Sequence, residues 1–119
     1  MESFKDLKVW QKSMLLVKEI YSIAKKLPKE ETFALSDQMR RSAISIPSNI
    51  AEGFGRNSAN EYARFLNIAK GSSYELETQL YICDMLNYSS NKEVKHAIEL
   101  TEEIEKMISA LVKSLSNNS

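Results

Sequence analysis

The stretch of sequence that decides the fold covers residues 38–56 and reads QMRRSAISIPSNIAEGFGR. Apolar side chains recur in and just before it at steps of three and four, which places them on one face of an α-helix. They are Leu35, Met39, Ala43, Ile46, Ile50 and Phe54. Pro47 lies inside this pattern and removes one backbone donor. We predict a kinked but continuous helix from about Glu31 to Phe54; the alternative is a true break, with Ser45 capping a new helix. Gly53 and Gly55 then permit the left-handed backbone that ends a helix.

Three further segments have the same helical spacing. The first is stopped by Pro28, and the other two open at Ser58 and Ser90 with a Ser-x-x-Glu capping box. The connections between segments are short, so consecutive helices must be antiparallel. The sequence predicts an all-α fold, an antiparallel up-down four-helix bundle with a proline-kinked second helix, forming a single domain over residues 1–119.

The first segment carries two apolar stripes. One consists of Leu7, Trp10, Met14, Val17, Tyr21 and Ala24, and the other of Val9, Leu16, Ile20, Ile23 and Leu27. A helix with two stripes contacts neighbours on two sides, either inside a bundle or between subunits. In the middle of the third segment, Gly71, Ser72 and Ser73 are all small. Because glycine in a helix interior costs about 1 kcal/mol relative to alanine, we predict that these residues let another helix come close, namely the one that carries Pro47.

Charge is balanced over the 119 residues, with 16 basic and 16 acidic side chains. Residues 1–56 carry a net +3 and residues 57–119 a net −3, an asymmetry that suits head-to-tail self-association or a weak basic patch. Cys83 is the only cysteine, which excludes an internal disulfide, and its apolar surroundings predict a buried side chain. The N-terminal residues lack the apolar core of a signal peptide and the apolar runs are too short to span a membrane, so we expect a cytoplasmic protein.

The sequence shows no catalytic apparatus. His96 is the only histidine, and Glu93 lies three residues before it, the spacing found in di-iron bundles. Those sites need two such motifs and two more carboxylates, so a solvated surface histidine is the better interpretation. One histidine and one cysteine do not support a zinc site or a nucleophile–base pair. We expect no metal, no cofactor and no enzymatic activity.

The polar face of the predicted second helix has two interpretations. Arg41, Ser45, Ser48 and Glu52 form one row along it, with Asn49 beside them. In the structural interpretation, these five residues pack in a polar network with Glu75 and Glu77 of the third helix, and Glu52, Glu75 or Glu77 neutralises Arg40 or Arg41. In the functional interpretation, arginines present forked donors to phosphate or to carboxylates of a partner. The candidates are Arg40, Arg41, Arg56 and Arg64.

Three motifs together resemble the four-helix bundle family of 23S rRNA-intervening sequence proteins. They are FKDLxVW from Phe4, QxxRxAxSIxxNIAEG from Gln38 and FLxIAxGSxxELETQL from Phe65. The chain is also similar to the accessory variability determinant protein of diversity-generating retroelements. That resemblance implies a homopentameric barrel of bundles with a basic surface that contacts nucleic acid and a reverse transcriptase. It supplies no catalytic residues.

From these observations we expect a non-enzymatic, oligomeric interaction module that binds RNA or DNA weakly through its arginine surface. One alternative is a purely structural scaffold for a protein partner, without nucleic-acid binding. The least favoured alternative is a metal-dependent helical-bundle enzyme.

Overall fold

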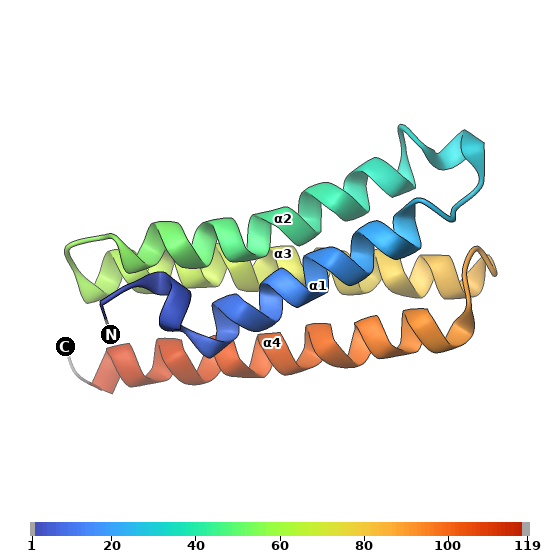
Figure 1. Cartoon of the computed structure of the whole chain (residues 1–119). Coiled ribbons are helices and arrows are strands. Elements are labelled where there is room, and N and C mark those ends of the chain that lie inside the picture. The colour runs from blue at the N-terminus through green and yellow to red at the C-terminus, as the bar shows by residue number, and fades with distance from the viewer. Residues whose placement is uncertain (1, 118–119) are drawn as a thin grey trace.

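The computed structural model of the chain describes residues 2–117. It consists of the helices α1 (Lys8–Ala24), α2 (Leu35–Phe54), α3 (Ala59–Met85) and α4 (Asn91–Asn117), with short 3-10 helices at Phe4–Asp6 and Lys29–Glu31. The helices lie side by side in an elongated body with extents of 47 × 22 × 20 Å (Figure 1). The predicted all-α four-helix bundle is therefore confirmed.

The four helices pack as a closed ring of neighbours. α1 packs against α2, α2 against α3, α3 against α4, and α4 against α1, while within residues 2–117 the Cα atoms of the diagonal pairs are more than 8 Å apart. Figure 1 shows the chain reversing direction at each connection, which is the expected up-down arrangement. Within the same residues, no helix combines the length and the apolarity that crossing a lipid bilayer requires.

The core forms where the apolar faces of the four helices meet. Its largest fully buried side chains include Leu16, Ile20, Met39, Ile46, Ile50, Leu66, Leu76, Leu80, Ile104 and Ile108. Burying each such side chain stabilises the fold by roughly 1.5–3 kcal/mol. Of the two stripes on α1, the second, Val9 to Leu27, is buried throughout. The first stripe is left partly open, with Met14 45% and Tyr21 42% exposed.

α2 is continuous through Pro47, so the alternative of a break capped by Ser45 is wrong. The kink at Pro47 stays a prediction. The helix begins at Leu35, later than predicted, because the chain first makes a 3-10 turn from Lys29 to Glu31. The Glu31 carboxylate then accepts a hydrogen bond of 3.4 Å from the Leu35 amide, which satisfies one of the free donors of the first turn.

The left-handed residue of the fold is Asn87 rather than a glycine. Gly55 caps α2 with a φ of −80°, and none of the glycines has a positive φ, so the predicted left-handed end of α2 is wrong. Asn87 has a φ of 57° just after α3. There the Tyr88 amide donates to the Cys83 carbonyl at 3.0 Å and the Asn87 amide donates to the Asp84 carbonyl at 3.1 Å. These two bonds form a Schellman motif, in which asparagine is the usual substitute for glycine.

The closest glycine contact between α2 and α3 lies at Gly53. A Cβ atom added to Gly53 would lie 2.8 Å from Phe65 Cβ and 3.1 Å from Tyr62 Cδ1, whereas a Cβ at Gly71 would have nothing within 4 Å. Of the three small residues predicted to allow a close approach to α2, Gly71 does not contact it. Its neighbour Ser72 does reach α2, through a hydroxyl–hydroxyl hydrogen bond of 2.8 Å with Ser45.

Candidate functional site

The structure divides the four candidate arginines into two pairs. Arg40 and Arg41 lie near the start of α2, while Arg56 follows its end and Arg64 lies in the first turns of α3. At 1.5 Å per residue, the 16 residues from Arg40 to Arg56 span roughly 24 Å along the helix axis. One phosphate group therefore cannot contact both pairs, and the four arginines form two separate pairs within one chain.

The first pair makes local contacts. The Arg41 Nε donates to Asp37 Oδ2 at 2.9 Å, and the Arg41 side chain is 79% exposed. The Arg40 guanidinium lies 5.7 Å from the centroid of the Tyr21 ring on α1. Neither arginine is bound to Glu52, Glu75 or Glu77, so the predicted neutralisation of Arg40 or Arg41 by those glutamates is wrong. Asp37 and Arg41 are four residues apart, a spacing from which this ion pair could have been predicted.

A smaller polar network than predicted joins α2 to α3. The Ser42 hydroxyl donates to Glu75 Oε1 at 2.6 Å, and Asn49 Nδ2 donates to the Ser45 carbonyl at 2.8 Å and to its hydroxyl at 3.0 Å. Through Ser45 the chain of contacts continues to Ser72. Of the predicted members, Ser45, Asn49 and Glu75 take part in these contacts, and Ser42 is an addition. Ser72 was predicted to lie close to α2, but not to join the polar network.

The other predicted members of the network lie elsewhere. Ser48 is exposed and lines a groove between α1 and α2. Glu52 lies 3.6 Å from Arg56 Nη2 across one helical turn. Glu77 lies near the carboxyl group of Glu105 on α4. The residues predicted to form a single network therefore make several separate contacts instead.

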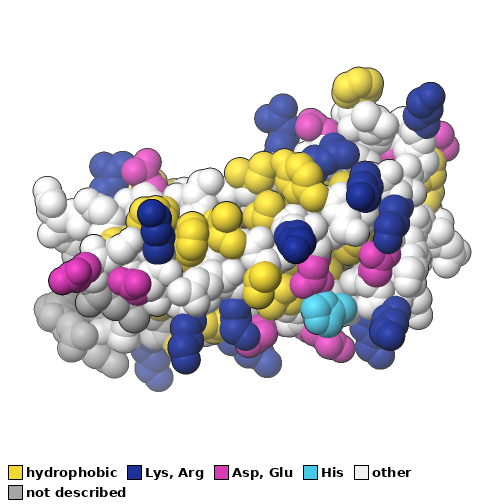
Figure 2. All heavy atoms as spheres, viewed as in Figure 1, with side chains coloured by type: hydrophobic (Ala, Val, Ile, Leu, Met, Phe, Trp, Pro, Cys, Tyr) yellow, Lys and Arg dark blue, Asp and Glu magenta, His cyan; other side chains and the backbone are white. Residues whose placement is uncertain are grey.

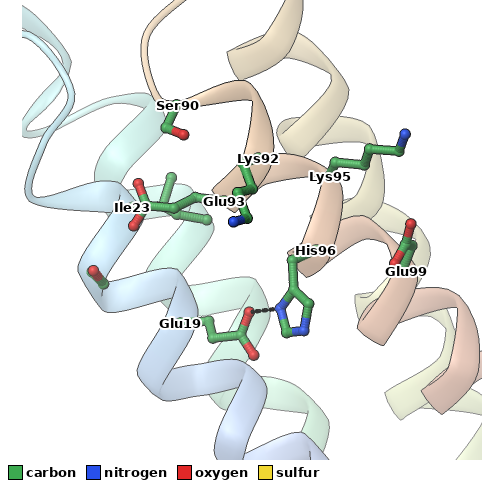
Figure 3. Close-up of a pocket in the computed structure, with 9 residues that line it drawn as sticks. Glu19, Ile23, Ser90, Lys92, Glu93, Lys95, His96 and Glu99 are labelled. Carbon is green, nitrogen blue, oxygen red and sulfur yellow. Dashed lines mark hydrogen bonds and ion pairs between the residues drawn. The ribbon is translucent and has the colours of Figure 1, made fainter.

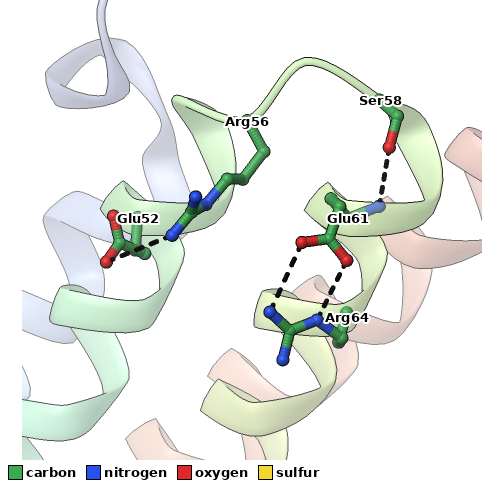
Figure 4. Close-up of polar contacts among 5 residues, drawn as sticks. All are labelled: Glu52, Arg56, Ser58, Glu61 and Arg64. Atoms are coloured by element: carbon green, nitrogen blue, oxygen red, sulfur yellow. Dashed lines mark hydrogen bonds and ion pairs between the residues drawn. The ribbon is translucent and has the colours of Figure 1, made fainter.

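The second arginine pair surrounds Phe65 at the turn between α2 and α3. The guanidinium carbons of Arg56 and Arg64 lie 4.7 Å and 4.5 Å from the centroid of the Phe65 ring. Arg64 Nε donates to Glu61 Oε2 at 3.0 Å (Figure 4). This hydrogen bond lowers the pKa of the Glu61 carboxyl group. The carboxylate is thus occupied by Arg64, and only half of the predicted capping box forms, through the Glu61 amide that donates to the Ser58 hydroxyl at 3.1 Å.

An apolar groove of about 290 Å³ runs between α1 and α2. It is lined by Trp10, Met14, Val17, Ile44, Pro47, Ser48 and Ala51. Figure 2 shows hydrophobic side chains gathered over these two helices on the face turned to the viewer. Two of the lining residues, Met14 and Ile44, are 45% and 42% exposed. This groove contains the stripe of α1 that the core leaves open.

A larger groove, of about 550 Å³, lies between α1 and α4 and has charged side chains around its edge. A hydrogen bond of 2.7 Å joins His96 Nδ1 to Glu19 Oε1 across it (Figure 3). The Glu19 carboxylate raises the pKa of His96, and the His96 side chain is exposed, so the predicted surface position is confirmed. Glu93 binds Lys26 at 2.8 Å instead of joining His96. Over residues 2–117, no group of three or more His, Cys, Asp or Glu residues could hold a metal ion.

Cys83 is fully buried, as predicted, with its Sγ 3.5 Å from Met39 Sδ. Burial raises the pKa of its thiol to about 11. Because the thiolate is the reactive form of cysteine, this side chain serves packing and has no nucleophilic character at neutral pH.

The comparisons with known proteins agree with this architecture. The chain is similar to a solved structure from Bacteroides thetaiotaomicron VPI-5482, a protein with unknown function from the S23 ribosomal protein family. The two are 28% identical, the likeness covers 88% of this chain and 98% of that one, and the TM-score is 0.82. No curated protein matches the sequence. Residues 5–110 match the sequence model described as 23S rRNA-intervening sequence protein. Since this match covers most of the chain, the protein belongs to the family of 23S rRNA-intervening sequence proteins.

Proposed function

We propose that this protein is a non-enzymatic interaction module that assembles with copies of itself through the groove between α1 and α2. The observation that carries the proposal is the groove itself, lined mainly by apolar side chains such as Trp10, Met14 and Ile44. An exposed apolar surface rimmed by polar residues is typical of a protein–protein contact. We expect five copies, the number that the resemblance to the accessory variability determinant implies.

The distribution of charge supports a head-to-tail contact. Residues 1–56, which include α1 and α2, carry a net +3, and residues 57–119, which include α3 and α4, carry a net −3. A contact between the first two helices of one copy and the last two of the next would bring opposite charges together. Contacts of this heterologous type close into rings when the rotation between copies allows it.

The test places a charge in the groove. We expect wild-type protein at micromolar concentration to sediment as an oligomer and Ile44→Glu to sediment as a monomer, because a carboxylate in a dry contact is strongly disfavoured. Phe33→Glu is the matched control, since Phe33 is 94% exposed and lies outside the groove. Analytical ultracentrifugation measures both. A wild-type monomer, or equal loss of assembly in the two variants, would contradict the proposal.

A second candidate function is binding of RNA or DNA phosphates, and the arrangement of Arg56 and Arg64 around Phe65 favours it. Two guanidinium groups at one end of the bundle form a compact positive surface that can donate to phosphate oxygens. Their present partners, Glu52 and Glu61, are exposed, and exposed ion pairs are worth about 0–1 kcal/mol. A phosphate could therefore replace these carboxylates at small cost. Arg40 and Arg41 would contribute to binding only if the nucleic acid is long enough to extend along α2.

Salt dependence tests this second candidate. For a fluorescent single-stranded RNA, we expect affinity to fall as salt rises and the double variant Arg56→Gln/Arg64→Gln to bind more weakly. Losing two phosphate contacts should reduce the slope of log K against log salt by about 1.4. Arg40→Gln/Arg41→Gln shows whether the other pair takes part, and Lys113→Gln, an exposed cation on α4, is the control. Binding that is insensitive to salt, or is unchanged in both double variants, would exclude a phosphate contact through these arginines.

A further inference from the structure

Glu105 is a carboxylic acid inside the seam between α3 and α4. Its side chain is 9% exposed, and it follows the core residue Ile104 on α4. Its Oε2 atom is buried and has no hydrogen-bond partner among the described residues. An isolated carboxylate in such a place would be strongly destabilising.

The groups around Glu105 are mostly acidic. On α3, Glu77 and Ser73 lie within hydrogen-bonding reach of Glu105, and Glu102 is near it on α4 itself. Tyr74 of α3 and Lys106 of α4 line the same groove as Glu102 and Glu105. The pKa of Tyr81 on α3 is raised by partial burial and, to a smaller extent, by the negative charges of Glu102, Glu77 and Glu105.

α4 also packs against α1, and the basic side chain that α1 offers to α4 binds a residue other than Glu105. Lys12 of α1 binds Glu103. Two residues along a helix correspond to a rotation of about 200°, so Glu103 projects from nearly the opposite side of α4 from Glu105. No cation from α1 therefore compensates the carboxyl pair in the α3–α4 seam.

We propose that Glu77 and Glu105 hold one proton between them and that loss of this proton loosens the seam between α3 and α4. Two ionised carboxylates have only acceptors, so they can share a hydrogen bond only while one of them carries a proton. When the proton leaves, two like charges face each other in a partly dry interface, with Glu102 nearby as a third. Separating α4 from α3 is the movement that relieves this repulsion.

The direction of the pH effect follows from the protonation states. Burial and the carboxyl group of Glu77 raise the pKa of Glu105 to about 8, against an ordinary value of 4.5. Between these values the folded chain holds a proton that the unfolded chain releases. The contribution of this carboxyl group to stability is therefore greatest below pH 4.5. It falls as the pH rises towards 8 and is constant above that. One linked proton changes the unfolding equilibrium constant by about tenfold per pH unit in that window.

The direct test is a titration of the glutamate side-chain carboxyl carbons of the wild-type protein by NMR. We expect one of them to titrate with a midpoint near 8, and the midpoint to disappear in Glu105→Gln. If every glutamate of the wild-type protein titrates below pH 6, the pair does not hold a proton and the proposal is overturned. Because the titration is made on the wild-type protein, it tests the proposal even if Glu105→Gln does not fold.

Urea unfolding between pH 5 and pH 9 tests the effect on stability. The glutamine of Glu105→Gln stays neutral, so we expect the fall in stability between pH 5 and pH 8 to be lost. A smaller decline above pH 6.5 should persist, since His96 loses its bond to Glu19 as it deprotonates. Glu103→Gln is the control, because it removes one exposed carboxylate from the same helix and should keep the full slope. Equal slopes in wild type and Glu105→Gln would contradict the proposal.

Hydrogen exchange locates the change. After correction for the intrinsic effect of pH on exchange, we expect backbone amides on the facing sides of α3 and α4 to lose protection between pH 6 and pH 9. Those in the seam between α1 and α2 should change less, and Glu105→Gln should suppress the difference. A uniform loss of protection over all four helices would show global destabilisation and exclude a local loosening of this seam.

Discussion

Gly53→Val is expected to destabilise the bundle by about 1–3 kcal/mol, the usual cost of forcing extra atoms into a packed interface. The first added carbon would already lie 2.8 Å from Phe65 Cβ and 3.1 Å from both Tyr62 Cδ1 and the Tyr62 carbonyl oxygen. A Cβ and a backbone carbonyl cannot rotate out of the way, so α3 must move as a whole. Chemical denaturation measures the loss as a lower midpoint of unfolding.

Gly71→Ala is the matched control for this prediction. Gly71 also lies inside a helix, but it is exposed and an added Cβ meets nothing within 4 Å. Alanine there should raise stability by about 1 kcal/mol, the ordinary gain from removing glycine from a helix interior. If Gly53→Val is as stable as wild type, or if both substitutions shift stability in the same direction, the close contact at Gly53 does not determine how α2 packs on α3.

Leu76→Ala is expected to cost about 2–5 kcal/mol, the range for deleting a large buried aliphatic side chain. Leu76 lies on α3 and is fully buried in the core that the four helices share. Its removal leaves a cavity that the neighbouring helices cannot fill without moving from their packed positions. Since domains of this kind are stable by only about 5–15 kcal/mol, the variant should unfold at a much lower urea concentration.

The same chemical change at the surface provides the comparison. Leu15 lies on α1 and is 58% exposed. Leu15→Ala should change stability by no more than about 0.5 kcal/mol. Similar midpoints for Leu76→Ala and Leu15→Ala would mean that the core is not packed around Leu76 as the structure describes.

The fold could be predicted from the sequence because its main signal is local. Apolar residues at steps of three and four, as in Met39, Ala43, Ile46 and Ile50, determine which face of each helix is buried. Breaks at Pro28 and the cap at Ser58 fix where helices end and begin. Short connections then leave little choice except neighbouring antiparallel helices.

The contacts between helices could not be predicted in the same way, because they depend on how each helix is rotated about its own axis. One residue corresponds to a rotation of about 100°. Gly53 and Gly71 look alike in sequence, yet one faces Phe65 and the other faces solvent. The pairing of Ser42 with Glu75 likewise depends on the register between α2 and α3. Pairs within one helix, such as Glu61 with Arg64, were predictable from spacing alone.

Glu105 illustrates a different limit of sequence analysis. Its position beside Ile104 puts it at the edge of the apolar stripe of α4, where a charged residue usually extends into solvent. The structure instead buries it against Glu77. Burial in the seam, together with a second acidic side chain on another helix, gives this glutamate a raised pKa.

The closed ring of helix contacts implies an order of assembly. Three of its seams join helices that follow each other in the chain, whereas the seam between α1 and α4 joins its two ends. The cost of closing a loop rises with its length, so the three hairpins should form first and the α1–α4 seam last. The ion pairs Lys12–Glu103, Lys26–Glu93 and Glu19–His96 connect residues 67 to 91 positions apart, at this seam or beside it. The step that completes folding is thus the one most exposed to ionic strength, while the early hairpins depend mainly on apolar contacts.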